Sequence, residues 1–210
     1  MTQPGIVVAA GDADIAPVAA CERDRRALLQ RGCVLGGAAV AASSIPLLLL
    51  VRNAFAQADG DAGVLQTLIT NEQISVIAYD TALASGLLSP AAIRIARRFR
   101  DHEQQHAETL TTALMDLGGA PPPPPRGIAD VDQVADGLSD AKSQRALVAV
   151  LIELEMAGVA AYHEAHRTLL ETRLLQTSAS IMAAEGQHLV VLRTLARTDP
   201  VPNAFETGST

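Results

Sequence analysis

Residues 96–117 read ARRFRDHEQQHAETLTTALMDL, and the EQQH in the middle of this stretch is its most informative part. Positions three and four apart lie on one stripe of a helix, and here that stripe is apolar except at its centre. Its members are Ala96, Phe99, Glu103, His106, Leu110, Ala113 and Leu117. A glutamate and a histidine therefore stand where a helix in a bundle would bury apolar side chains.

Three further stretches carry the same kind of stripe, each with a glutamate at an apolar position. The stripes contain Leu65, Leu68, Glu72, Val76, Tyr79 and Leu83; Val148, Leu151, Glu155, Val159, Tyr162, His166 and Leu169; and Leu174, Ser178, Ile181, Glu185, His188, Leu192 and Leu195. The last of them repeats the Glu-x-x-His spacing. We therefore expect four helices, over residues 62–85, 90–117, 139–172 and 174–197. Ser89 is the expected N-cap of the second helix, and Ser139 or Asp140 that of the third.

The links between the expected helices differ in length. The first link, residues 86–89, and the last, near residues 171–177, are short, which favours antiparallel neighbours within each pair. The middle link, residues 118–138, is long and includes the five prolines 121–125, which span about 15 Å as polyproline II. We interpret it as a strap along a four-helix bundle rather than an interdomain linker, because a lone helical hairpin cannot bury its apolar stripe.

Composition agrees with an all-helical chain and excludes several classes of protein. Ala and Leu dominate the 210 residues, whereas aromatic residues make up only 2%, which disfavours a β-sandwich. A net charge of −7 disfavours nucleic acid as a partner. Both cysteines, Cys21 and Cys33, precede the expected mature domain, so zinc fingers and iron–sulfur clusters are excluded there.

The first 56 residues are predicted to be a twin-arginine-type signal peptide, which leaves residues 57–210 as the domain. Arg25 and Arg26 precede an apolar run over residues 32–51, and Ala-Phe-Ala follows at residues 54–56. We expect cleavage after Ala56, or less favourably after Ala58. The protein would then be exported to the periplasm or beyond, with the twin-arginine translocase as its partner during export. An uncleaved membrane anchor is the alternative, because about 20 apolar residues can span a bilayer.

The glutamates on the four stripes require compensation. A buried unpaired carboxylate costs several kcal/mol, and four of them in one core would repel one another. Two divalent cations would balance four negative charges, and two neutral imidazoles would complete the ligand set. The predicted ligands are Glu72, Glu103, His106, Glu155, Glu185 and His188. Oxygen and imidazole ligands indicate iron or manganese, with zinc also able to bind.

The spacing of these residues repeats within the chain. Tyr79 follows Glu72 by seven residues, and Tyr162 follows Glu155 by seven. The two helical hairpins therefore resemble a duplicated unit around a pseudo-two-fold axis. We expect each tyrosine to donate to a ligand on a facing helix, and we treat both tyrosines as candidate catalytic residues.

One glutamate from each of two helices, with Glu-x-x-His from each of the other two, resembles the ligand pattern of ferritin-like di-iron and di-manganese proteins. The tyrosine seven residues after the first glutamate is similar to bacterioferritin and rubrerythrin. The chain as a whole looks most like exported bacterial ferritin-like domain proteins. This resemblance implies an up-down-down-up four-helix bundle with one long crossover between its second and third helices. It also implies redox chemistry with dioxygen or peroxide, as in a ferroxidase or a manganese catalase, and a possible homodimer.

Other interpretations stay open at this point. The chain could be a non-catalytic exported bundle with a stress-related or structural role, in which zinc or protonated glutamates stabilise the core. Glu153 competes with Glu155 as the third-helix ligand, although it lies two residues off the stripe. His166 is expected to be a hydrogen-bonded histidine of the core or the bundle end, and His102 and His163 are expected to be exposed.

Overall fold

A computed structural model of the chain describes residues 53, 55, 58–131 and 137–208. The chain divides into two units, Met1–Ala39 and Val40–Thr210, and every described residue belongs to the second. The predicted signal peptide lies outside the described residues, except for Asn53 and Phe55. Its cleavage and its role in export therefore stay predictions.

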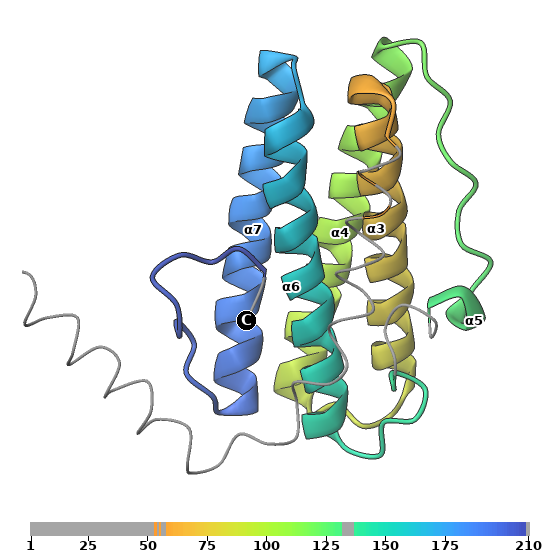
Figure 1. The fold of residues 1–210 in the computed structure, drawn as a ribbon. Helices are drawn as coiled ribbons and strands as arrows, with labels where there is room; N and C mark the ends of the chain where they lie inside the picture. Colours follow the sequence, from red (N-terminus) through yellow and green to blue (C-terminus); the bar gives the residue numbers. More distant parts are fainter. Residues whose placement is uncertain (1–52, 54, 56–57, 132–136, 209–210) are drawn as a thin grey trace, which may run out of the picture. The chain divides into compact units, whose positions relative to one another are not determined.

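Four long helices make up most of the described part of the chain, in which no strand occurs. Their bounds are Gly60–Ala84 for α3, Pro90–Asp116 for α4, Gln144–Thr168 for α6 and Thr172–Ala196 for α7. Short links join α3 to α4 and α6 to α7, so each pair forms an antiparallel hairpin, and Figure 1 shows the two hairpins side by side. The predicted all-α fold with four bundled helices is confirmed.

Residues 118–131 of the long crossover run back along the outside of the bundle, as Figure 1 shows, and α4 and α6 point the same way. This gives the predicted up-down-down-up order. The crossover contains a short helix that the sequence did not predict, α5, over Ile128–Val131, which packs against α3. The beginning of the crossover also contacts α3, because Gln66 Nε2 donates a hydrogen bond to the Ala120 carbonyl at 3.1 Å.

Serine caps define where two of the helices begin. Ser89 is the N-cap of α4, as expected, and its hydroxyl accepts a hydrogen bond from the backbone N–H of Ala92. The N-cap of α6 is Ser143, so the expectation of Ser139 or Asp140 is wrong, and the helix begins five residues later than residue 139. The backbone N–H of Ser89 donates to the Gln144 side chain at 2.7 Å, which joins the beginnings of these two helices.

Burial follows the expected stripes closely on α6 and α7 and less closely on α3 and α4. On α3 the buried residue in the middle of the stripe is Ser75 rather than Val76. On α4 the buried residue near the end is Leu114, whereas Leu117 is 44% exposed. The reason is geometric: a straight helix has 3.6 residues per turn, so its buried face drifts away from a strict 3.5-residue repeat.

Of the helices in the described part, α6 is long and apolar enough to cross a membrane by length and composition. However, 61% of its most apolar window is buried inside the bundle. Its apolar side chains therefore serve as core. The apolar run over residues 32–51, for which we weighed a retained anchor, lies outside the described residues.

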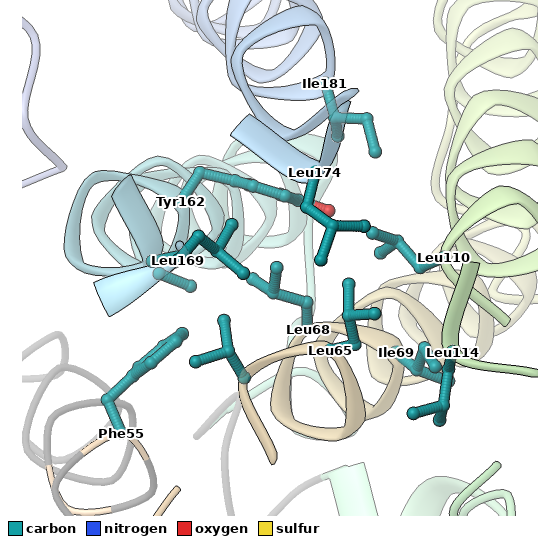
Figure 2. Packing of buried hydrophobic residues seen from close by; sticks show 13 residues of the cluster. Phe55, Leu65, Leu68, Ile69, Leu110, Leu114, Tyr162, Leu169, Leu174 and Ile181 are labelled. Carbon is teal, nitrogen blue, oxygen red and sulfur yellow. The ribbon is translucent and has the colours of Figure 1, made fainter. Parts of the chain in front are cut away.

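Two apolar clusters lie on either side of the glutamates along the bundle. Tyr79, Phe99 and Leu151 belong to one cluster. The other, drawn in Figure 2, contains Phe55, Val64, Leu65, Leu68, Ile69, Leu110, Leu114, Ala161, Tyr162, Ala165, Leu169, Leu174 and Ile181. Because Phe99 and Leu110 are in different clusters, the α4 residues between them lie in a layer with apolar side chains above and below.

The C-terminal tail packs back on the bundle after α7. Arg193, buried on α7, forms an ion pair with Glu206 of the tail at 2.7 Å. Gly208 has a φ of +70°, and a Cβ there would lie 2.0 Å from the Met156 carbonyl oxygen of α6. Only glycine suits this close approach, so the tail is part of the folded domain.

A substitution of Phe55 tests how much the segment before α3 contributes to the stability of the fold. The side chain is 5% exposed and belongs to the apolar cluster in Figure 2. We expect Phe55→Ala in the full chain to lower the free energy of unfolding by about 3 kcal/mol, measured by denaturant titration. Cleavage after Ala56 would remove the same contact.

Phe205→Ala is the matched control, because that phenylalanine is 85% exposed. We expect a change within about 0.5 kcal/mol for this variant. Equal effects of the two substitutions would show that Phe55 does not pack in the core.

Candidate metal centre

Each long helix brings one buried glutamate to the layer between the two apolar clusters. These glutamates are Glu72 of α3, Glu103 of α4, Glu155 of α6 and Glu185 of α7, and none is more than 2% exposed. Apolar side chains above and below keep bulk water away, so charges interact strongly there. The four predicted glutamates therefore share one buried site.

His106 lies among three of these glutamates. Its Nδ1 is 3.4 Å from Glu72 Oε2, 3.6 Å from Glu103 Oε2 and 3.2 Å from Glu185 Oε1. One ligand atom from each of these four residues lies within 4.8 Å of the others, as binding to one ion would require. We call this group the Glu72/His106 position.

His188 lies in a matching arrangement. Its Nδ1 is 3.0 Å from Glu103 Oε1, 3.2 Å from Glu155 Oε2 and 4.0 Å from Glu185 Oε2. These four residues also offer ligand atoms within 4.8 Å of one another. We call this second group the Glu155/His188 position. Glu103 and Glu185 belong to both groups, so each has the placement of a ligand that bridges two ions.

The two buried tyrosines hold the two glutamates that are not shared. The hydroxyl of Tyr79 on α3 donates a hydrogen bond to Glu155 on α6, and that of Tyr162 on α6 donates to Glu72 on α3. Burial, the largest cause, and the nearby carboxylates raise the pKa of both tyrosines well above its ordinary value. The hydroxyls therefore keep their protons and act as donors. The contacts cross between α3 and α6 in the symmetrical way that the sequence repeat suggests.

The shared glutamates carry the unfavourable charge of the site. Burial is the largest cause that raises the pKa of Glu103 and of Glu185, and the negative charge of Glu155 raises both further. Each of these two carboxyls therefore favours its protonated form in the metal-free protein.

The pKa values of both histidines and of Glu155 shift in the direction opposite to the one that burial alone would cause. Burial alone would lower the pKa of His106, but its close contacts with the carboxyl groups of Glu103, Glu185 and Glu72 outweigh burial and raise this pKa to about 12. Burial opposes ionisation of Glu155 and His188 as well, yet their mutual contact lowers the pKa of the acid and raises that of the imidazole. In the metal-free protein, protons therefore supply positive charge to this layer.

Several buried ligand atoms have no hydrogen-bond partner among the described residues. They are both carboxylate oxygens of Glu103, Oε1 of Glu185 and Nδ1 of His106. A buried polar atom without a partner costs about 1–3 kcal/mol. A divalent cation in each position would satisfy these atoms, and an oxygen–imidazole donor set suits iron, manganese or zinc. The residues present therefore fit a pair of divalent ions, although they leave the metal unidentified.

A glycine provides the space for one of the shared ligands. A Cβ on Gly158 of α6 would lie 3.2 Å from Glu185 Oε2 and 3.8 Å from Asn71 Nδ2. The 3.2 Å distance is short for a contact between a carbon and a carboxylate oxygen. A larger side chain at this position would therefore displace the Glu185 carboxylate.

The structure also places the histidines outside the predicted ligand set. His163 is exposed, as expected. His102 is half-buried, and its Nδ1 lies 2.9 Å from Nε2 of His188, so the expectation that it is exposed is wrong. The sequence feature that indicates this partial burial is the position of His102 four residues before His106, on the same side of α4. His166 is half-buried, and its Nε2 has no hydrogen-bond partner among the described residues. Glu153 belongs to neither metal position.

Comparison with known proteins agrees with the fold. The family model for the ferritin-like domain matches residues 60–198, which include all four long helices and both candidate metal positions. The search of the curated proteins finds no match. The family match covers well over half of the 210 residues. The chain belongs to the ferritin-like domain family.

Proposed function

We propose that this protein is an exported di-metal redox protein that reacts with dioxygen or peroxide. The observation that supports the proposal is the pair of overlapping ligand groups, which share Glu103 and Glu185 in a layer enclosed by apolar side chains. Two bound iron or manganese ions would supply redox chemistry with dioxygen or peroxide. The chain's own residues would hold the ions and shape their surroundings.

The residues of the site fall into two roles in this proposal. Glu103 and Glu185 contact both histidines, so their carboxylates would help to hold an ion in either position. Glu72 and Glu155 are each held by a tyrosine hydroxyl, which orients the carboxylate and stabilises its charge. Tyr79 and Tyr162 thus support ligands rather than bind metal directly.

The metal decides between two reactions in this proposal. With iron, the protein would oxidise substrate Fe(II) to Fe(III) while dioxygen or peroxide accepts the electrons, as a ferroxidase does. With manganese, it would disproportionate peroxide, as a catalase does. The oxygen and imidazole ligands are suitable for either metal, because selection between them depends on geometry and supply.

Export is the second part of the proposal, and its support comes from the sequence. Arg25 and Arg26 stand before the apolar run of residues 32–51, and Ala-Phe-Ala follows at residues 54–56. The twin-arginine route carries folded, cofactor-loaded proteins. A protein whose ligands come from four separate helices can hold its metals only after folding, which suits that route.

Glu103→Gln tests the metal site and the reaction together. We expect wild-type protein to bind two ions per chain, and to oxidise Fe(II) or consume peroxide. The variant should lose metal and activity, because glutamine removes the charge of a shared ligand. In the metal-free state, the free energy of unfolding of the variant should be about 1 kcal/mol higher than that of wild type, since one unfavourable buried carboxyl is gone. Elemental analysis, activity assays and denaturant titration provide the measurements.

Glu108→Gln is the control for this experiment, because Glu108 is an exposed glutamate of the same helix. It should change neither metal content nor activity. Wild-type protein with less than half an ion per chain, and inert to Fe(II) and peroxide, would refute the proposal. Wild-type protein that holds two ions but is inert would support the non-catalytic alternative.

Tyr79→Phe tests the hydroxyl contact with Glu155. We expect the variant to fold and to lower the reaction rate or the metal affinity by about 10–100-fold, as other partners of metal ligands do. Tyr162→Phe should give a comparable loss, because its hydroxyl holds Glu72 in the equivalent way. Steady-state rates and metal titrations of both variants would check this, and unchanged values in both would exclude a role for the tyrosines.

Replacing both arginines, Arg25→Lys and Arg26→Lys, tests the export route. We expect the double variant to stay in the cytoplasm, because the twin-arginine route requires the arginine pair. Cell fractionation with immunoblotting measures the distribution. Export of the double variant at the wild-type level would show that the chain does not use this route.

A further inference from the structure

We propose that His102 is a positioning residue that holds the ring of His188, and that this makes the Glu155/His188 position the tighter of the two metal positions. The inference rests on the di-metal site of the proposed function and adds a difference between its two halves. The residue belongs to neither candidate ligand group.

The first argument is the hydrogen bond between the two rings. His188 directs Nδ1 toward Glu103 and Glu155, and its Nε2 lies 2.9 Å from Nδ1 of His102. A neutral imidazole that binds metal through Nδ1 carries its proton on Nε2. His188 therefore donates that proton to His102, which selects the tautomer whose Nδ1 lone pair points at the metal position.

The second argument is the packing around the His188 ring. The ring of Phe99 stacks on it with centroids 3.9 Å apart and an interplanar angle of 26°. The His102 ring lies nearly parallel to it as well, at 5.2 Å and 21°. Phe99 and His102 are both on α4, whereas His188 is on α7, so one helix holds a ligand that belongs to another. The His188 side chain is only 2% exposed.

The third argument is that the two Glu-x-x-His segments differ in the residue that precedes the glutamate. His102 stands one residue before Glu103, and the equivalent residue before Glu185 is Ala184, which has no side-chain acceptor. His106 contacts glutamates through its Nδ1, its ring lies 6.4 Å from that of His188 and 6.5 Å from that of His102, and its side chain is 13% exposed. The Glu72/His106 position therefore has a less constrained histidine, so we expect an ion to bind there more weakly.

The experiment uses the full chain, stripped of metal, and titrates it with Co(II) by calorimetry and visible absorption. We expect wild-type protein to bind two ions with different affinities. His102→Leu should weaken the tighter step by about 10–100-fold and leave the weaker step unchanged. His102→Asn should restore much of the loss, because an amide oxygen at this place can accept the His188 proton. A merely structural role would not produce this rescue.

His163→Leu is the matched control, since it removes an exposed histidine and should leave both steps unchanged. Equal losses in both steps, no loss in His102→Leu, or no recovery in His102→Asn would overturn the inference. Two Co(II) ions bound as predicted, with iron- or manganese-loaded protein inert, would refute the proposed reaction while the role of His102 stands. A wild-type chain that binds no Co(II) would refute both.

Discussion

Four carboxylates and two imidazoles in one buried layer set the main physical constraint on this protein. Apolar side chains on both sides of the layer keep water away, so each negative charge needs a partner inside the bundle. The unshared glutamates have partners, since tyrosine hydroxyls hold both of them. Glu103 and Glu185 lack comparable support, and burial raises the pKa of both carboxyls. A pair of divalent ions would relieve this imbalance.

The two helical hairpins repeat the same spacing of site residues, which matches the approximate symmetry of the site, and the two halves differ in detail. Each hairpin contributes one glutamate held by a tyrosine and one Glu-x-x-His pair. The histidines differ, however, because His188 is enclosed by Phe99 and His102 whereas His106 is partly exposed. In a two-metal protein, such a difference would separate an ion that stays bound from one that exchanges.

Much of this architecture could be predicted, because periodicity and ligand spacing are local. The four stripes placed the six candidate ligands on four helices, and the long middle link indicated the crossover. Ends and exact core positions were less predictable. The beginning of α6 was misplaced because several polar residues could cap it, and Leu114 replaced Leu117 in the core because the buried face drifts along a straight helix. The position of His102 four residues before His106 indicated the side of α4 on which it lies, but its contact with His188 of α7 depends on how the two helices pack.

The amino-acid order alone predicted roughly which face of each helix turns inward, because the rise and rotation of a helix repeat regularly along the chain. It also placed four glutamates on the core faces of four helices, which predicts that positive charge compensates them. Packing between the helices settled which glutamates are shared, which tyrosine reaches which carboxylate, and which histidine has a second histidine behind it. These features depend on the rotation and offset of one helix against another, and many side chains far apart in the chain set those jointly.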